Sequence, residues 1–118
     1  MRIKLENPSS LSKAIEILSD LVTEVRIKVS DFGMSITAID PANVAMVSFK
    51  MPKIVFSEFE SGKEVLGVNL ENLKRILRRC GAGSALILEK EDNLLRLHIQ
   101  DKVKRNFSLA LIDIEAEE

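Results

Sequence analysis

The sequence has 118 residues, with one cysteine, one histidine and no tryptophan or tyrosine, which is the length of a single domain. Hydrophobic residues make up 46% of it and 17 basic residues nearly balance 18 acidic ones, which is typical of a folded domain and excludes a disordered segment. The lone Cys80 excludes an internal disulfide and a multi-cysteine zinc site, and the apolar runs are too short to span a bilayer. We therefore expect no structural metal, no secretion and no membrane insertion.

The first half of the chain predicts a strand, a helix and three further strands. Residues 2–6 alternate polar and apolar side chains, as a half-buried strand does. Asn7 is expected to cap a helix that begins with Pro8, because apolar residues then recur along one stripe from Leu11 to Val22. Renewed alternation predicts three strands at residues 25–30, 34–38 and 45–51.

The second half repeats this order of elements at an offset of about 60 residues, although residue identities barely repeat. After a link at residues 53–63, the patterns predict a strand at 64–69, a helix at 70–80 and strands at 85–90, 94–100 and 103–112. Each helix has one apolar stripe and most strands have one apolar side. The sequence therefore predicts an α+β domain in which a βαβββ unit occurs twice, as an eight-strand antiparallel sheet with both helices on one face.

Positive charge is concentrated in the second predicted helix. Between Leu70 and Cys80 there are four basic residues and one acidic residue, in a chain whose net charge is −1. The four basic residues, opposite the apolar stripe, are Lys74, Arg75, Arg78 and Arg79. A solvated helix surface is the ordinary interpretation, but like charges at this spacing repel one another, and a polyanion facing them would relieve the repulsion. Because no aromatic residues lie between them, the pattern favours contact with a phosphate backbone over readout of bases.

Three segments of the chain carry a family resemblance. These are Gly67–Arg79, which begins Gly-Val-Asn-Leu, Ala38–Val47, which contains Asp-Pro-Ala-Asn-Val, and the closing Leu109–Asp113. In order along nearly the whole chain, they resemble the N-terminal domain of the sliding clamp called proliferating cell nuclear antigen, in its archaeal form. The resemblance implies the DNA clamp fold. It also implies that residues 1–118 form a single N-terminal clamp domain, without the interdomain connector and second domain, as an excised fragment or a natural half clamp.

The resemblance implies a DNA polymerase sliding clamp, which is a processivity factor with no catalytic activity and no cofactor. Such clamps form rings around duplex DNA and touch its backbone without regard to sequence. The implied partners in replication and repair are DNA polymerase, ligase, flap nuclease and the clamp loader, together with further copies of the chain when the second domain is present. The implied location is the cytoplasm, at the nucleoid, or the nucleus if the source is eukaryotic.

Three sets of functional residues also follow from the resemblance. The DNA-binding residues of the inner ring are Lys13, Lys74, Arg75, Arg78 and Arg79. The residues of the pocket for partner peptides are Ile39, Ala42, Asn43 and Val44. The residues of the subunit-joining strand are Lys104, Arg105, Phe107, Leu109 and Leu111. From the residues alone, the second set is equally a plain turn, and Phe107 would simply belong to the core.

Catalysis finds little support in the sequence. His98 falls on the polar side of a predicted strand, so a solvent-facing histidine is expected, and Cys80 falls on an apolar stripe, so a core thiol is expected. The sequence shows no Ser, His and Asp set and no metal-ligand spacing. The alternative to a clamp is a non-catalytic protein-interaction adaptor whose basic helix binds an acidic protein partner, and salt dependence and competition by DNA would separate the two.

Overall fold

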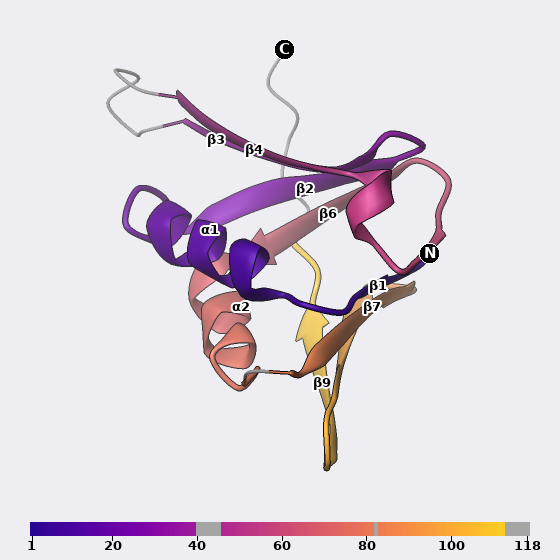
Figure 1. The fold of residues 1–118 in the computed structure, drawn as a ribbon. Helices are drawn as coiled ribbons and strands as arrows, with labels where there is room; N and C mark the ends of the chain where they lie inside the picture. The colour runs from indigo at the N-terminus through magenta and orange to yellow at the C-terminus, as the bar shows by residue number, and fades with distance from the viewer. Residues whose placement is uncertain (40–45, 82, 113–118) are drawn as a thin grey trace.

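The structure, a computed structural model, describes residues 1–39, 46–81 and 83–112. The helices of the described residues are α1 (Ser9–Ser19), α2 (Leu70–Leu77) and the short 3-10 helix η1 (Lys53–Val55), and α1 and α2 lie beside two antiparallel sheets (Figure 1). The strands are β1 (Arg2–Leu5), β2 (Glu24–Ser30), β3 (Gly33–Ile39), β4 (Met46–Pro52), β5 (Glu58–Glu60), β6 (Glu64–Asn69), β7 (Ala85–Glu91), β8 (Leu94–Gln100) and β9 (Lys104–Ala110). None of the described helices has the length and apolar character needed to cross a membrane.

The two βαβββ halves of the chain exchange their first strands. β1, from the first half, pairs with β7 of the second half, and β6, from the second half, pairs with β2 of the first. The strand orders are accordingly β4-β3-β2-β6 in one sheet and β5-β1-β7-β8-β9 in the other. Each sheet contains strands of both halves, so the predicted repeat of the βαβββ unit is present and its halves are interlocked.

The strand count and the division into sheets differ from the sequence-based prediction. The described residues form nine strands in two sheets, where the pattern predicts eight strands in one sheet. The additional strand, β5, lies in the link at 53–63 and is too short to show an alternation, and its Phe59 stands opposite Ile3 of β1. After β9, the Ile112 N–H donates to the Gly67 carbonyl at 2.9 Å, but β6 and β9 form no ladder within the described residues. The sheet is therefore interrupted there.

Asparagine side chains lie at the start of both helices. Asn7 Oδ1 accepts from the Ser9 N–H at 3.2 Å, but the N-cap position of α1 is Pro8, which carries no side-chain cap, so α1 begins one residue later than predicted. At the start of α2, the N-cap Asn69 accepts from the Asn72 N–H through its Oδ1 at 3.0 Å. The prediction extends α2 to residue 80, but the α-helix ends at Leu77. Beyond it the chain continues in tighter turns, in which the Cys80 N–H donates to the Leu77 carbonyl at 3.0 Å.

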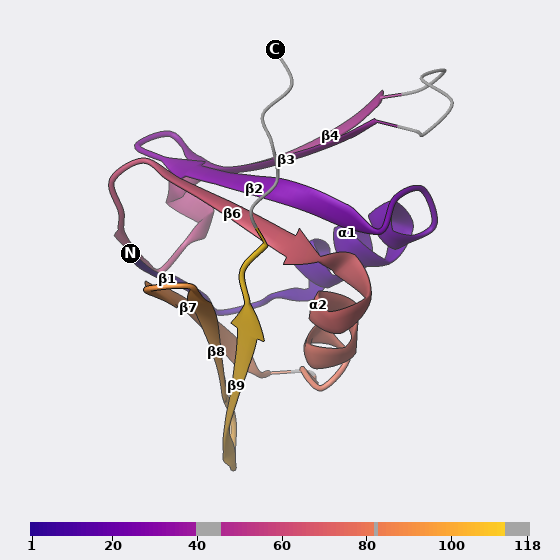
Figure 2. The ribbon, with the colours of Figure 1, turned by 180° about the vertical axis from the view of Figure 1, so that it is seen from behind.

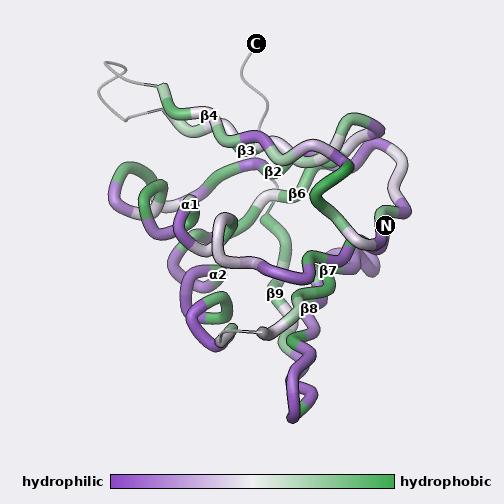
Figure 3. The backbone as a smooth tube through the Cα atoms, in the orientation of Figure 1, coloured by the Kyte–Doolittle hydropathy of each residue, from purple (hydrophilic) through white to green (hydrophobic). Residues whose placement is uncertain are grey.

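Both helices lie side by side on the same side of the molecule, as the front and back views agree (Figures 1 and 2). Hydrophobic and hydrophilic residues alternate along α1 and α2 (Figure 3), and only the hydrophobic ones are buried. The largest fully buried side chains of the common core come from both helices and both sheets: Ile3, Ile15, Leu18, Met34, Ile36, Leu66, Leu70, Leu77, Leu86, Leu95 and Leu97. The opposite sides of the two helices form a surface that is free to meet a polar partner.

Candidate nucleic-acid interface

The basic residues of α2 lie on its outward side. The Arg75 side chain is 70% exposed and the Arg78 side chain 58% exposed, while Leu73 and Leu77 are buried in the core. Arg79 follows the helix and is exposed as well. The structure therefore separates the apolar and basic sides of this segment as the helical spacing predicts, and it leaves guanidinium groups available to solvent.

Lys74 differs from its neighbours because its side chain is only 14% exposed. Its ammonium group lies 3.1 Å from the carboxylate of Glu71, one turn earlier in α2. The same carboxylate lies 3.9 Å from Nε of Arg75, at the limit of an ion pair. Lys74 thus packs its stem along the helix and has its charge matched locally, whereas Arg75 extends outward.

Arg78 joins the two helices through a two-point ion pair with Glu16 of α1. Its Nε donates to one carboxylate oxygen at 2.7 Å and its Nη2 donates to the other at 3.1 Å. The hydrogen bond from Arg78 holds the pKa of the Glu16 carboxyl below its ordinary value, and the same hydrogen bond raises the pKa of Arg78. Glu16 is therefore an acidic member of a surface that the sequence marks as basic.

Arg79 is directed toward the edge of the β5-β1-β7-β8-β9 sheet. Its guanidinium carbon lies 6.0 Å from the ring centroid of Phe107 on β9, which is the geometry of a cation–π contact. Phe107 itself is half-buried and packs against the core. Arg79 thus points to the predicted subunit-joining strand, away from the group formed by Arg75 and Arg78.

Lys13 is the predicted DNA-binding residue on α1, and it is exposed. It borders a depression between the beginning of α1 and the end of α2, which Ser12 and Cys80 also line. Burial raises the pKa of the Cys80 thiol, which packs against the core but is only half-buried, where the sequence predicts a core thiol. We call Lys13, Arg75 and Arg78 the basic surface, because they are the exposed cations on the outward sides of the two adjacent helices.

The other two predicted sets are only partly placed. Ile39 ends β3, opposite Met46 in the ladder, while Ala42, Asn43 and Val44 of the predicted peptide pocket lie outside the described residues. The subunit-joining set lies on and just after β9, whose one edge pairs with β8 and whose other edge has no partner among the described strands. On β9, Lys104 is exposed, Arg105 and Phe107 are half-buried and Leu109 is buried, and beyond it Leu111 is half-buried. An unpaired edge of this kind can accept a strand from a neighbouring chain.

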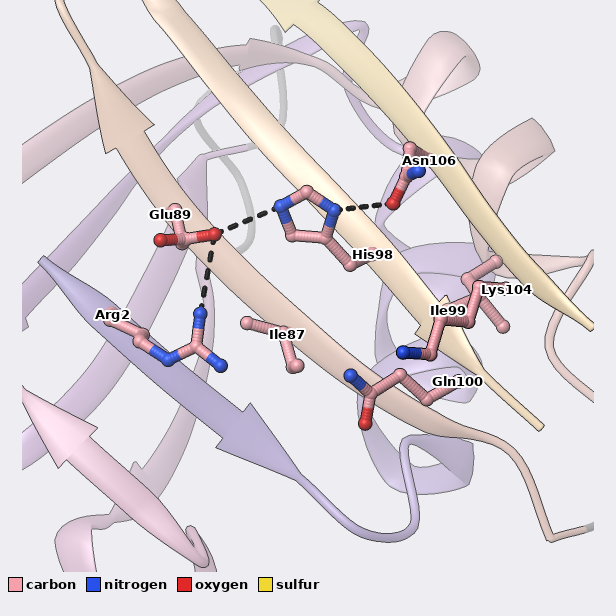
Figure 4. Close-up of a pocket in the computed structure, with 8 residues that line it drawn as sticks. All are labelled: Arg2, Ile87, Glu89, His98, Ile99, Gln100, Lys104 and Asn106. Atoms are coloured by element: carbon pink, nitrogen blue, oxygen red, sulfur yellow. Dashed lines mark hydrogen bonds and ion pairs between the residues drawn. The ribbon is translucent and has the colours of Figure 1, made fainter.

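His98 belongs to a row of polar side chains across the sheet, and with Arg2, Glu89 and Asn106 it lines a pocket on that face (Figure 4). Its Nε2 lies 2.9 Å from the Glu89 carboxylate and its Nδ1 lies 2.6 Å from Oδ1 of Asn106 on β9. Glu89 in turn lies 3.4 Å from Arg2, which lies 3.7 Å from Glu58, so the row crosses all five strands. Sequence reasoning missed the row because its members meet through strand pairings that the alternation does not reveal. The described residues contain no cluster of three or more His, Cys, Asp or Glu side chains able to hold a metal ion.

Comparison with known proteins decides the family. Residues 1–118 match the family described as the proliferating cell nuclear antigen, N-terminal domain. The chain belongs to this family. It is 38% identical over 115 residues to the DNA polymerase sliding clamp of Pyrococcus horikoshii, covering 96% of this chain and 46% of that protein. It is also 38% identical over 112 residues to the DNA polymerase sliding clamp of Methanococcus maripaludis, covering 93% of this chain and 45% of that one.

A solved structure with the same fold is the PCNA2-PCNA3 complex of Sulfolobus tokodaii. The TM-score is 0.94 at 24% sequence identity, and the superposition covers 100% of this chain and 49% of that chain. At this identity the likeness establishes the fold alone. The resemblance to proliferating cell nuclear antigen and the α+β clamp fold that it implies are both confirmed, and the chain spans about half the length of these relatives.

Proposed function

We propose that this chain is the N-terminal domain of a DNA polymerase sliding clamp, and that its basic surface faces the phosphate backbone of an encircled duplex. The observation that carries the proposal is the outward position of Arg75 and Arg78 on a domain of this family. The domain is proposed to act without catalysis or a cofactor, since its work is to hold other proteins at DNA. That work places it with the chromosome, in the cytoplasm at the nucleoid or in a nucleus.

The basic surface has few exposed cations, and this limits how tightly it can hold DNA. Each phosphate contact adds to affinity in a salt-dependent and sequence-independent way, and the basic surface offers only Lys13, Arg75 and Arg78. Contacts this few hold a duplex weakly. Retention on DNA would then come from enclosure by a ring, and the weak contacts would keep the duplex centred and free to move along the hole.

Ring formation is proposed to use the unpaired edge of β9. Main-chain groups of Lys104–Ala110 can extend the β5-β1-β7-β8-β9 sheet by a strand from another subunit, while Phe107 and Leu109 supply apolar contact on the inner side. Each subunit would need a second clamp domain, joined by a connector, to present the complementary edge. The proposed partners of the assembled ring are DNA polymerase, ligase, flap nuclease and a clamp loader, which would bind near Ile39 and residues 42–44.

The proposal can be tested by titrating the isotope-labelled 118-residue chain with short duplexes of two different sequences. We expect weak binding that is indifferent to sequence, that shifts amide signals of α1 and α2, and that falls steeply between about 50 and 200 mM salt. The double reversal Arg75→Glu with Arg78→Glu should abolish these shifts. The matched control, Lys50→Glu with Lys63→Glu, makes the same charge change at exposed positions away from the helices and should bind like the unaltered chain.

Two results would count against the proposal. One is unchanged duplex binding by the Arg75 and Arg78 double variant in a chain that remains folded. The other is binding of an acidic peptide to α2 that excess duplex does not displace, which would favour the protein-interaction adaptor.

A further inference from the structure

A carboxylate, that of Glu16, lies beside the basic surface, and the proposed function gives it no role. Glu16 lies on α1, its side chain is 38% exposed, and it binds the guanidinium of Arg78 at two points, 2.7 Å and 3.1 Å. The two residues are 62 positions apart in the sequence, so only the packing of α1 against α2 brings them together. Of the two arginines of the basic surface, Arg78 has the closer carboxylate partner among the described residues. Its Nε lies 2.7 Å from Glu16, whereas Nε of Arg75 lies 3.9 Å from Glu71.

The geometry leaves part of Arg78 available. A guanidinium carries five N–H donors, and Glu16 occupies the side formed by Nε and Nη2, so Nη1 remains free to donate to another acceptor. A phosphate that approached Nη1 would meet a cation whose charge is already offset by Glu16. It would also meet the negative charge of the carboxylate itself, within the distance over which charges interact in dilute salt.

The ion pair is not what holds the helices together. α1 and α2 meet through buried apolar side chains, and Leu11 of α1 lines the same enclosed part of the core as Leu73 and Leu77 of α2. An ion pair as exposed as that of Glu16 with Arg78 contributes little to folding by comparison. The carboxylate can therefore be removed without loosening the domain, and its effect on ligands can be measured separately from its effect on stability.

We propose that Glu16 weakens the hold of the basic surface on duplex DNA by occupying Arg78. The inference rests on the proposed function and adds a residue to it, since Glu16 touches no phosphate and acts through the arginine that does. A domain that must move along DNA benefits from phosphate contacts that break readily, and a carboxylate bound to one of the two arginines of the basic surface keeps those contacts weak.

The test compares Glu16→Gln with Asp20→Asn in the 118-residue chain, titrated with a short duplex across a range of salt concentrations. Both variants remove one negative charge at the same helix, but Asp20 forms no ion pair among the described residues. We expect Glu16→Gln to lower the dissociation constant about tenfold at low salt. The slope of the logarithm of the binding constant against the logarithm of the salt concentration should steepen by about 0.9, as one added phosphate contact would make it. Asp20→Asn should change the dissociation constant less than about threefold.

A second pair of variants shows whether Arg78 transmits the effect. In an Arg78→Gln background, Glu16→Gln should no longer tighten binding, because the arginine that it releases is absent. Amide spectra of every variant establish that the domain is folded. The inference is overturned if Glu16→Gln behaves like Asp20→Asn, or if its gain persists without Arg78.

These outcomes are distinguishable from failure of the proposed function. If the Arg75 and Arg78 double reversal abolishes duplex binding while Glu16→Gln matches its control, the basic surface binds DNA and only the role of Glu16 is wrong. If the unaltered chain shows no duplex binding that depends on Arg75, the proposed role of the basic surface and the inference both fail.

Discussion

Arg79 lies over the ring of Phe107, with its guanidinium carbon 6.0 Å from the ring centroid. This contact links the segment after α2 to β9, which is one of the edge strands among the described residues. It also directs Arg79 away from Arg75 and Arg78, although all three arginines lie within residues 75–79. Residues that the sequence groups as one basic segment therefore divide between the proposed phosphate-facing surface and the edge strand β9.

Arg75 and Arg79 should differ in their effect on duplex binding. Replacing Arg75 with Ala removes an outward guanidinium, so the logarithmic salt slope of binding should fall by about 0.9. Replacing Arg79 with Ala should change the slope much less, because its guanidinium is directed to Phe107. Titrations with a short duplex at several salt concentrations measure both values, and a larger loss for Arg79→Ala than for Arg75→Ala would contradict the division.

Phe107→Ala should weaken both the domain and its assembly. The ring is half-buried against the core, so its removal should lower the free energy of unfolding by about 2 kcal/mol, less than for a fully buried phenylalanine. In a protein that also carries the second domain, the loss of this apolar contact on β9 should favour dissociation on dilution. Chemical denaturation and sedimentation measure the two effects. Ser108→Ala, at an exposed position of the same strand, is the control, and an oligomer of unchanged size on dilution would discard the assembly role.

Asp101 should make stability depend on pH in the acid range. Its carboxylate accepts three hydrogen bonds, from the Val103 N–H at 2.9 Å, the Ser84 hydroxyl at 2.9 Å and Arg105 at 2.7 Å. These hydrogen bonds lower the pKa of Asp101 from the ordinary value of 3.8. A carboxyl with a lowered pKa in the folded state stabilises the fold above its ordinary pKa, and this stabilisation is lost as the pH falls through the lowered pKa. Denaturation curves at a series of acid pH values should therefore show a steeper loss for the unaltered chain than for Asp101→Asn.

The control for this experiment is Asp31→Asn, at an exposed turn between β2 and β3. It should leave the acid profile close to that of the unaltered chain. Superimposable profiles of Asp101→Asn and the unaltered chain would show that the Asp101 contacts contribute nothing to the acid sensitivity.

Cys80 should react slowly with alkylating agents while the domain is folded. Burial raises the pKa of its thiol, so less thiolate is present at neutral pH than for an exposed cysteine. Mass spectrometry of the chain treated with iodoacetamide should show slow labelling, which denaturant accelerates to the rate of a free thiol. Equal rates in the folded and unfolded states would show that the half-buried position does not protect the thiol.

The helices and most strands could be predicted because their residues repeat with the period of their own element. The stripe from Leu11 to Val22 and the alternation from Leu94 to Gln100 report burial of one side without reference to any neighbour. This period does not indicate which residues of other elements each side of a helix or strand contacts. The pair of Glu16 with Arg78 and the contact of Arg79 with Phe107 depend on packing between distant segments, so the sequence marks these residues only as charged or apolar.

β5 and Lys74 illustrate two further limits. β5 has three residues, which is less than one full alternation, and it becomes a strand only because β1 offers it an edge. Lys74 has the helical position of a surface cation, but its long apolar stem lies along the protein and its ammonium group reaches Glu71. Helical position alone cannot distinguish a lysine that projects from one that lies flat.

The exchange of β1 and β6 between the halves makes the domain indivisible. A protease cut in the link at 53–63 would leave two fragments, each with a helix whose sheet is completed only by the other. Such fragments should co-purify as one particle, separate only in denaturant and regain structure only when mixed. The two halves of the chain therefore behave as interlocked partners joined by a covalent link, and neither is a folding unit by itself.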